Sequence, residues 1–258
     1  MTDLPLPPLE FRHLVGPMEP DAFDDPSVDG ALRTLPDAAF EFVFDYGCGC
    51  GRLARQLMRG GYAPQKYVGI DPHRGMIEWC RTNITARAPA FEFRHHDVFQ
   101  EFMNPDGQLD SLPLPAGDGE VTLFLAWSVF THVFERDAAY YLAEIARVLA
   151  PDGVAITTWF LFDKRDFPMM QSFQNALFIS DFDPTNAVIF DRGWLRDETA
   201  RAGLAMTRIT PPAVRGFQWT IQLEKAATGR QSVDFPPDTA PEGVVRAYAG
   251  EPSPSAHA

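Results

Sequence analysis

The sequence has few cysteines, no excess of basic residues and no long hydrophobic run. Its 258 residues include only 3 cysteines, and 35 acidic residues against 22 basic ones leave a formal charge of −13. A small, odd number of cysteines does not indicate a disulfide framework and fits a reducing compartment. A surface this acidic repels phosphate groups, so we do not expect nucleic acids or anionic membrane surfaces as partners.

From the sequence pattern we expect neither a membrane-spanning segment nor a leader. The longest apolar stretch, 154–162, falls well short of the roughly 20 residues that cross a bilayer. The first residues lack the basic segment followed by an apolar one that marks a secretory leader. We therefore expect a soluble cytoplasmic protein that acts on a small molecule. Its oligomeric state stays open, with a homodimer among the alternatives.

Strand and helix patterns alternate through the middle of the chain. Apolar runs typical of strands occupy 42–44, 66–71, 90–96, 121–126, 154–160, 206–209 and 217–223. Helical spacing is found at 52–59, 75–86, 136–149 and 194–202. The alternation predicts an α/β fold with a doubly wound, seven-stranded, mostly parallel sheet.

Three segments depart from this rhythm. Residues 1–40 hold 7 of the 23 prolines and are predicted to form an arm with little regular structure. Within the main domain, 41–225, residues 164–192 are rich in Phe and Met and are predicted to be an inserted lid or substrate-binding element. Residues 226–258, with five prolines, are predicted to be a flexible tail.

The strongest functional signal is the segment Asp45-Tyr46-Gly47-Cys48-Gly49-Cys50-Gly51, between the first strand and the first helix of the domain. Glycines at such a turn let the backbone come close to a ligand. The dinucleotide-binding spacing G-x-G-x-x-G would require glycine at position 52, where the chain has Arg52. The spacing present is G-x-G-x-G with an acid two residues ahead.

On these residues the chain resembles the class I S-adenosylmethionine-dependent methyltransferases, whose first motif is D/E-x-G-x-G-x-G at the same junction. The resemblance covers 41–163 and 194–224 and implies S-adenosylmethionine as the cofactor. It implies that the methionine end is held by Asp45, Gly47, Cys48, Gly49 and Gly51. It also implies a ribose site at Asp71 and Pro72, an adenine site at Asp97 and Val98, and a methyl side lined by Ala126 and Trp127.

Simpler interpretations exist for several of these residues. Asp71 and Asp97 could be turn or helix-capping acids, but their joint spacing with the glycine loop favours the cofactor. Cys48 and Cys50 have no second cysteine or histidine pair to complete a zinc site. His95 and His96 are neighbours on a strand and point to opposite faces, so we expect no metal there either.

The segment after the fourth strand bears on the methyl acceptor. Methyltransferases of nucleic-acid amino groups and of some protein amides commonly carry Asn/Asp-Pro-Pro-Tyr here, whereas this chain has 126–132 as Ala-Trp-Ser-Val-Phe-Thr-His. This segment, with 190–191 and 194–195, resembles a branch of small bacterial class I enzymes, some of them in glycan and secondary-metabolite pathways. We expect methylation of a hydroxyl on a sugar, a glycan precursor or another small metabolite. The alternatives are carbon or nitrogen methylation of a small metabolite, a nicotinamide-dependent oxidoreductase, and a non-catalytic cofactor-binding module.

A hydroxyl acceptor benefits from a base that takes its proton. His132 is the candidate, because it follows the strand whose end faces the methyl group and because histidine titrates near neutral pH. The alternative is a histidine that hydrogen-bonds the backbone near a helix start. Asp163 and His73 are weaker candidates.

Overall fold

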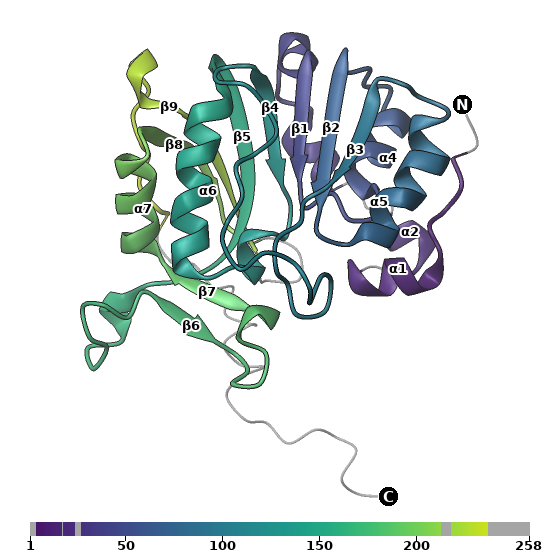
Figure 1. Ribbon diagram of the computed structural model, residues 1–258. Helices are drawn as coiled ribbons and strands as arrows, with labels where there is room; N and C mark the ends of the chain where they lie inside the picture. The colour runs from purple at the N-terminus through teal and green to yellow at the C-terminus, as the bar shows by residue number, and fades with distance from the viewer. Residues whose placement is uncertain (1–3, 17, 24–26, 213–217, 237–258) are drawn as a thin grey trace, which may run out of the picture.

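The computed structural model describes residues 4–16, 18–23, 27–212 and 218–236, and its centre is a twisted sheet (Figure 1). Its strands are β1 (Phe42–Tyr46), β2 (Lys66–Asp71), β3 (Phe91–His95), β4 (Val121–Ala126), β5 (Leu149–Phe162), β8 (Leu204–Thr210) and β9 (Trp219–Lys225). They pair in the order β3-β2-β1-β4-β5-β9-β8. Strands β1 to β5 are parallel and β9 is antiparallel to both neighbours, which confirms the predicted sheet.

Helices cover both faces of the sheet. On one face, α6 (Glu135–Val148) and α7 (Arg192–Arg201) pack on alternate side chains of β1 and β4. On the other face, the intervening side chains of β1 and β4 are covered by α4 (Arg52–Arg59) and α5 (Arg74–Cys80). Helix α5 continues as a π turn over Arg81–Thr85. Burial on both faces explains why these strands read as continuous apolar runs.

Strand β5 is longer at both ends than the predicted 154–160: it starts at Leu149, which pairs with Val121, and its far end leads into residues 164–192, called the lid below. Thr157 pairs with Ala126, the last residue of β4, and the strand then continues for five more residues. Its end pairs in parallel with β7 (Val188–Asp191), which pairs antiparallel with β6 (Ala176–Phe178). The lid also contains two short 3-10 turns, Lys164–Asp166 and Pro184–Asn186.

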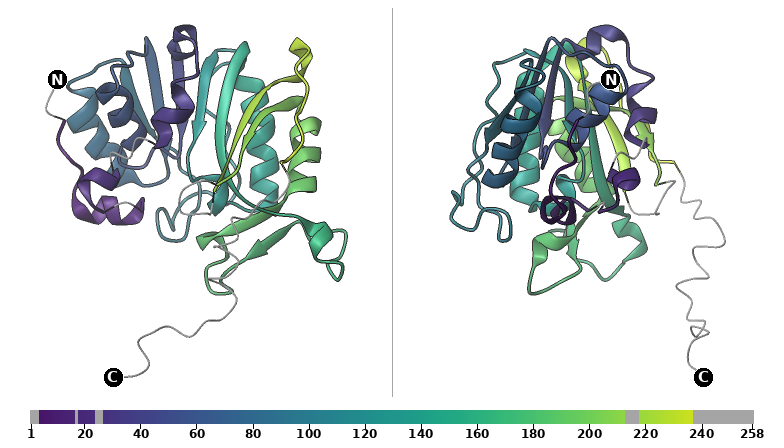
Figure 2. Two further views of the ribbon diagram at one scale, coloured as in Figure 1. Left: turned by 180° about the vertical axis from the view of Figure 1, so that it is seen from behind. Right: turned by 90° about the vertical axis from the view of Figure 1, so that its right-hand side faces the viewer.

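The arm contains helices, so the expectation of little regular structure there was wrong. They are α1 (Leu9–Leu14), α2 (Pro20–Phe23), α3 (Ser27–Leu32) and a 3-10 turn over Asp37–Phe40. Pro8 and Pro36 immediately precede helical segments and Pro20 begins one, positions where proline costs no helical hydrogen bond. Figure 2 shows α1 and α2 at the edge of the sheet where the lid lies, whereas Asp37–Phe40 lie at the opposite edge, where β1 begins.

The first part of the predicted tail packs against the domain. After a 3-10 turn over Ala226–Thr228, the amide of Val233 donates to the carbonyl of Met206 at 2.8 Å. The ring of Phe235 lies 5.9 Å from that of Trp219. A flexible tail therefore does not describe 226–236, and 237–258 lie outside the described residues. Within the described part of the chain, no helix has the length and apolar character needed to cross a membrane.

Candidate active site

The glycine loop after β1 has a backbone that other residues would not easily adopt. Gly47, Gly49 and Gly51 have φ of +75°, +52° and +81°, in the left-handed region. A Cβ at Gly47 would lie 2.3 Å from Cγ2 of Val129, and one at Gly49 would lie 2.7 Å from Cγ1 of Val15. The loop is therefore packed between the segment after β4 and the arm.

Hydrogen bonds tie the loop to the end of β2. The amides of Gly47 and Cys48 both donate to the carbonyl of Ile70, at 2.8 and 2.9 Å. The amide of Gly49 donates to Oδ2 of Asp71 at 2.8 Å, and Oδ1 accepts from the amide of His73 at the same distance. Burial raises the pKa of Asp71. Each of its oxygens retains a second lone pair for a hydroxyl donor.

Asp45 lies under the loop, on the side of the sheet that α4 and α5 cover. It is fully buried, and its Oδ2 accepts from the hydroxyl of Tyr67 at 2.5 Å. Its Oδ1 has no hydrogen-bond partner among the residues that the structure describes. Burial raises the pKa of this carboxyl to about 7. An unsatisfied acidic oxygen beneath a glycine loop is a fitting partner for the amino group of the methionine end.

The end of β3 lies beside the end of β2, because Asp71 and His95 are paired in the two strands. A ring nitrogen of His95 is 2.9 Å from the carbonyl of Pro72. The side-chain amide of Asn104 donates to Oδ1 of Asp97 at 3.1 Å and to the carbonyl of Val98 at 3.0 Å. The first of these bonds holds the pKa of Asp97 below its usual value. The ionised, half-exposed carboxylate suits an adenine amino donor.

The loop, Asp71 and Asp97 thus lie at adjacent strand ends on one edge of the sheet, as a cofactor spanning β1 to β3 requires. Residues 43–153 match a family described as a methyltransferase domain. This chain carries a class I S-adenosylmethionine-dependent methyltransferase domain. The alternative of a nicotinamide-dependent oxidoreductase is therefore wrong. The cofactor of the methyltransferase is S-adenosylmethionine.

Solved structures with the same fold include three such enzymes. A methyltransferase from Leishmania major has 14% identity and a TM-score of 0.59, over 84% of this chain and 78% of that one. A TehB-like methyltransferase from Corynebacterium glutamicum has 16% identity and a TM-score of 0.52, over 84% and 94%. An O-methyltransferase from neocarzinostatin biosynthesis, solved with S-adenosylmethionine, has 17% identity and a TM-score of 0.50, over 76% and 52%.

The segment expected to line the methyl side follows the end of β4. Ala126 is fully buried and Trp127 packs on the cluster beneath α4 and α5. Ser128 then adopts φ +58°, a strained conformation for a residue other than glycine. Its amide donates to Oγ1 of Thr158 at 2.7 Å, and its Oγ lies 2.6 Å from Nε2 of Gln218. The strained turn brings Val129 against the glycine loop.

The candidate base His132 lies at the contact between the β4 segment and the lid. It ends a 3-10 turn over Phe130–His132 and is exposed. Its Nδ1 is 2.9 Å from the carbonyl oxygen of Thr185. A carbonyl can only accept, so in this bond Nδ1 carries the proton and Nε2 of the neutral ring has a free lone pair.

The weaker candidates have other roles. Nδ1 of His73 accepts from the amide of Met76 and caps α5. The guanidinium of Arg165 beside Asp163 lowers the pKa of that carboxyl to about 2, so it is a poor base. Ser128, Gln218 and the arm contact at Gly49 had no signal in the sequence, because each depends on residues brought together from distant segments.

The cysteines and histidines near the loop serve packing. Cys48, Cys50 and Cys80 are free and buried, and burial raises the pKa of Cys50 to about 12. A ring nitrogen of His96 lies 2.9 Å from the hydroxyl of Tyr141, and burial lowers the histidine's pKa to about 4. In the part of the chain that the structure describes, no three His, Cys, Asp or Glu residues are grouped as metal ligands.

Proposed function

We propose that the methyltransferase methylates a hydroxyl group of a sugar, a glycan precursor or another small metabolite. The observation that carries the proposal is the hydrogen bond from His132 to the lid, which leaves Nε2 able to take the acceptor's proton. The bound cofactor supplies a methyl group on a sulfonium, ready for in-line displacement. The chain must then align the acceptor oxygen and remove its proton.

The polar groups after β4 support an alcohol acceptor. Ser128 and Gln218 present a hydroxyl and an amide from two separate segments at the end of this strand. Such groups can both donate to and accept from an alcohol. The formal charge of −13 disfavours polyanionic acceptors, and the chain lacks the Asn/Asp-Pro-Pro-Tyr segment associated with amino-group acceptors. The proposed branch, small bacterial enzymes of glycan or secondary metabolism, rests on the sequence resemblance.

Two substitutions at His132 separate a base from a lid contact. His132→Ala removes both functions, whereas His132→Asn keeps a side-chain donor for the carbonyl of Thr185 and removes the base. We expect kcat to fall by about 10² or more in both variants, within the range for general-base catalysis, with unchanged affinity for S-adenosylhomocysteine. An Asn variant with normal kcat would assign His132 to lid positioning alone.

The bond formed can be identified directly. Turnover with a ¹³C-methyl cofactor, followed by NMR of the product, distinguishes methyl carbon bound to oxygen from methyl bound to nitrogen or carbon. A product methylated on nitrogen or carbon would overturn the proposed reaction and leave the methyltransferase assignment intact.

A further inference from the structure

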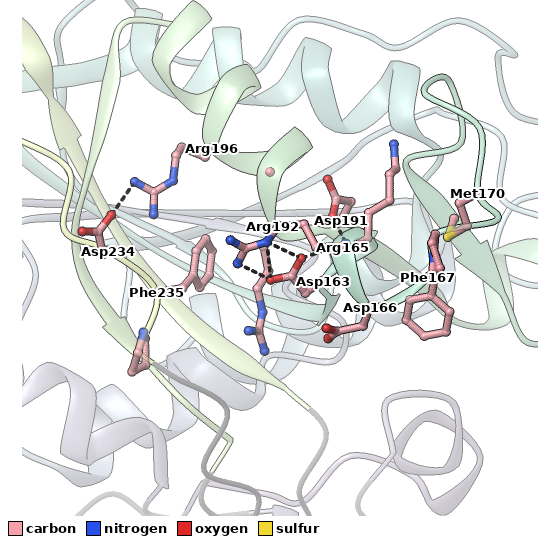
Figure 3. Close-up of a pocket in the computed structure, with 14 residues that line it drawn as sticks. Asp163, Arg165, Asp166, Phe167, Met170, Asp191, Arg192, Arg196, Asp234 and Phe235 are labelled. Carbon is pink, nitrogen blue, oxygen red and sulfur yellow. Dashed lines mark hydrogen bonds and ion pairs between the residues drawn. The ribbon is translucent and has the colours of Figure 1, made fainter.

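A second site is built around the end of β5, separate from the cofactor residues. It is a cavity of about 970 Å³, shown in Figure 3. Its walls come from the start of the lid, the first turn of α7 and residues 234–236. The cavity is large enough for a small-molecule ligand, and none of the glycine loop, Asp71 or Asp97 lines it.

The position of this cavity sets it apart from the point of methyl transfer. Ala126, where the methyl side begins, is level with Thr157 of β5. The cavity begins at Asp163, after five further strand residues. Asp163 lies six residues beyond Thr157, which at about 3.3 Å per residue is roughly 20 Å along the chain. A ligand in the cavity is therefore a different part of the acceptor from the hydroxyl that reacts.

The charges in the cavity walls balance. Four cations (Lys164, Arg165, Arg192 and Arg196) face four acids (Asp163, Asp166, Asp191 and Asp234). Arg196 pairs with Asp234 at 3.1 Å, and Arg165 forms a two-pronged bond with Asp163. Because the walls have no net charge and the whole chain is acidic, the cavity favours a neutral ligand with several polar groups over an anion.

Aromatic rings lie beside the guanidinium and carboxylate groups of the cavity walls. Phe167 and Phe235 are the aromatic residues that line the cavity, and the guanidinium of Arg192 lies 5.6 Å from the ring centre of Phe235. Arg196 lies 5.6 Å from the Phe235 ring. Phe167 is 47% exposed at the rim. Apolar faces next to donors and acceptors complement a sugar, whose ring has C–H faces and a rim of hydroxyl groups.

We propose that this cavity binds a neutral sugar unit of the acceptor, remote from the hydroxyl that is methylated. The acceptor is then an extended glycoside or oligosaccharide, because a single sugar ring does not reach from the cavity to the end of β4. The inference rests on the proposed function in that it treats the sugar as part of the methylated molecule.

An array of immobilised neutral, acidic and amino glycans, probed with the full chain and S-adenosylhomocysteine, tests the proposal. We expect retention on neutral glycans, reduced at least tenfold by Phe167→Ala and by Arg196→Gln. Phe173→Ala is the matched control, since Phe173 is 74% exposed on the lid and does not line the cavity. Thermal unfolding and S-adenosylhomocysteine affinity report that each variant is folded.

Three results would overturn the proposal: no retention on any neutral glycan, equal retention of Phe167→Ala and the unaltered chain, or a preference for acidic glycans. Each can occur while product analysis still shows oxygen methylation, so failure of this inference is distinguishable from failure of the proposed reaction. Conversely, glycan retention with methylation on nitrogen or carbon would refute the reaction and support the sugar site.

Discussion

At the scale of single residues, Asp45 combines complete burial with an oxygen that has no partner among the described residues. Its carboxyl has a pKa of about 7 in the folded protein and 3.8 as the reference value. Between these values the folded state keeps a proton that the unfolded state has lost. Its contribution therefore makes the free energy of unfolding fall as pH rises from about 4 to 7, by at most about 1.4 kcal/mol per pH unit.

Asp45→Asn removes this titration and can still accept the hydrogen bond from Tyr67. We expect the variant to gain stability relative to the unaltered chain as pH rises from 5 to 8, as measured by urea unfolding at each pH. Tyr67→Phe removes the hydrogen-bond donor to Asp45 and should raise the pKa of this carboxyl further. The free energy of unfolding of this variant should therefore fall over a wider range of pH. Parallel pH curves for Asp45→Asn and the unaltered chain would contradict the assignment.

Gly47 offers a second test at this scale, because strain and steric clash can be separated. Gly47→Ala adds a positive-φ penalty of roughly 1–2 kcal/mol and a Cβ that meets Val129. Gly203→Ala carries a similar φ of +79° with nothing within 4 Å, so it should show the strain alone. We expect Gly47→Ala to lose more stability and also cofactor affinity. Adding Val129→Ala should restore part of both, and no restoration would refute the clash.

At the scale of elements, the arm packs against the glycine loop and the residues after β2. Val15 contacts the loop at Gly49, and the ring of Phe11 lies 5.4 Å from that of His73, just after β2. Phe23 is fully buried in a cluster with Cys50 and Met76. Nη1 of the buried Arg55 donates to the carbonyls of Leu4 and Pro5, which fixes the start of the arm to α4.

Removing the contacts of Phe11 with His73 and of Val15 with the loop at Gly49 should shorten the residence of the bound cofactor. We expect Phe11→Ala with Val15→Ala to raise the dissociation rate of S-adenosylhomocysteine by roughly tenfold, the equivalent of about 1.4 kcal/mol. Leu9→Ala is the control, because Leu9 belongs to the same helix and is 59% exposed. Stopped-flow displacement measures the rate, and an unchanged rate in the double variant would separate the arm from the cofactor.

The sequence predicted the elements whose burial leaves a periodic pattern. Strands β1 to β5 and helices α4 to α7 were all found near their expected residues, because each buries a continuous run or one helical stripe. Strands β6 and β7 have three and four residues, too few to show a period. The arm helices are not predicted, because a high proline content is typical of segments without helix, whereas Pro8 and Pro20 lie at helix starts.

The candidate site also has a part that the sequence predicts and a part that it does not. Its glycines and acids follow strands in a recognisable order, so their convergence could be predicted from the parallel sheet. The left-handed turn at Ser128, its bond to Gln218 and the lid contact of His132 join segments up to 90 residues apart. No local pattern encodes such contacts, because they depend on how the lid and the last strands are placed.

At the scale of the whole molecule, the charge of −13 acts on the cofactor before contact. S-adenosylmethionine carries a sulfonium that S-adenosylhomocysteine lacks, so an acidic protein attracts it more strongly at long range. We expect the association rate of S-adenosylmethionine to fall more steeply with ionic strength than that of S-adenosylhomocysteine, between about 0.01 and 0.15 M salt. Equal salt dependence for the two ligands would show that the net charge plays no part.

The continuation of β5 into the lid bears on selectivity. The lid, 164–192, begins two residues after β5 ends, and near its other end the two oxygens of Asp191 accept from the amides of Lys164 and Trp194. One carboxylate therefore joins the first turn of the lid to the start of α7. A segment fastened at both ends behaves as a template rather than a hinged flap. The enzyme should then discriminate between epimers by fixed shape, because an acceptor with one inverted hydroxyl has no alternative lid position in which to be accommodated.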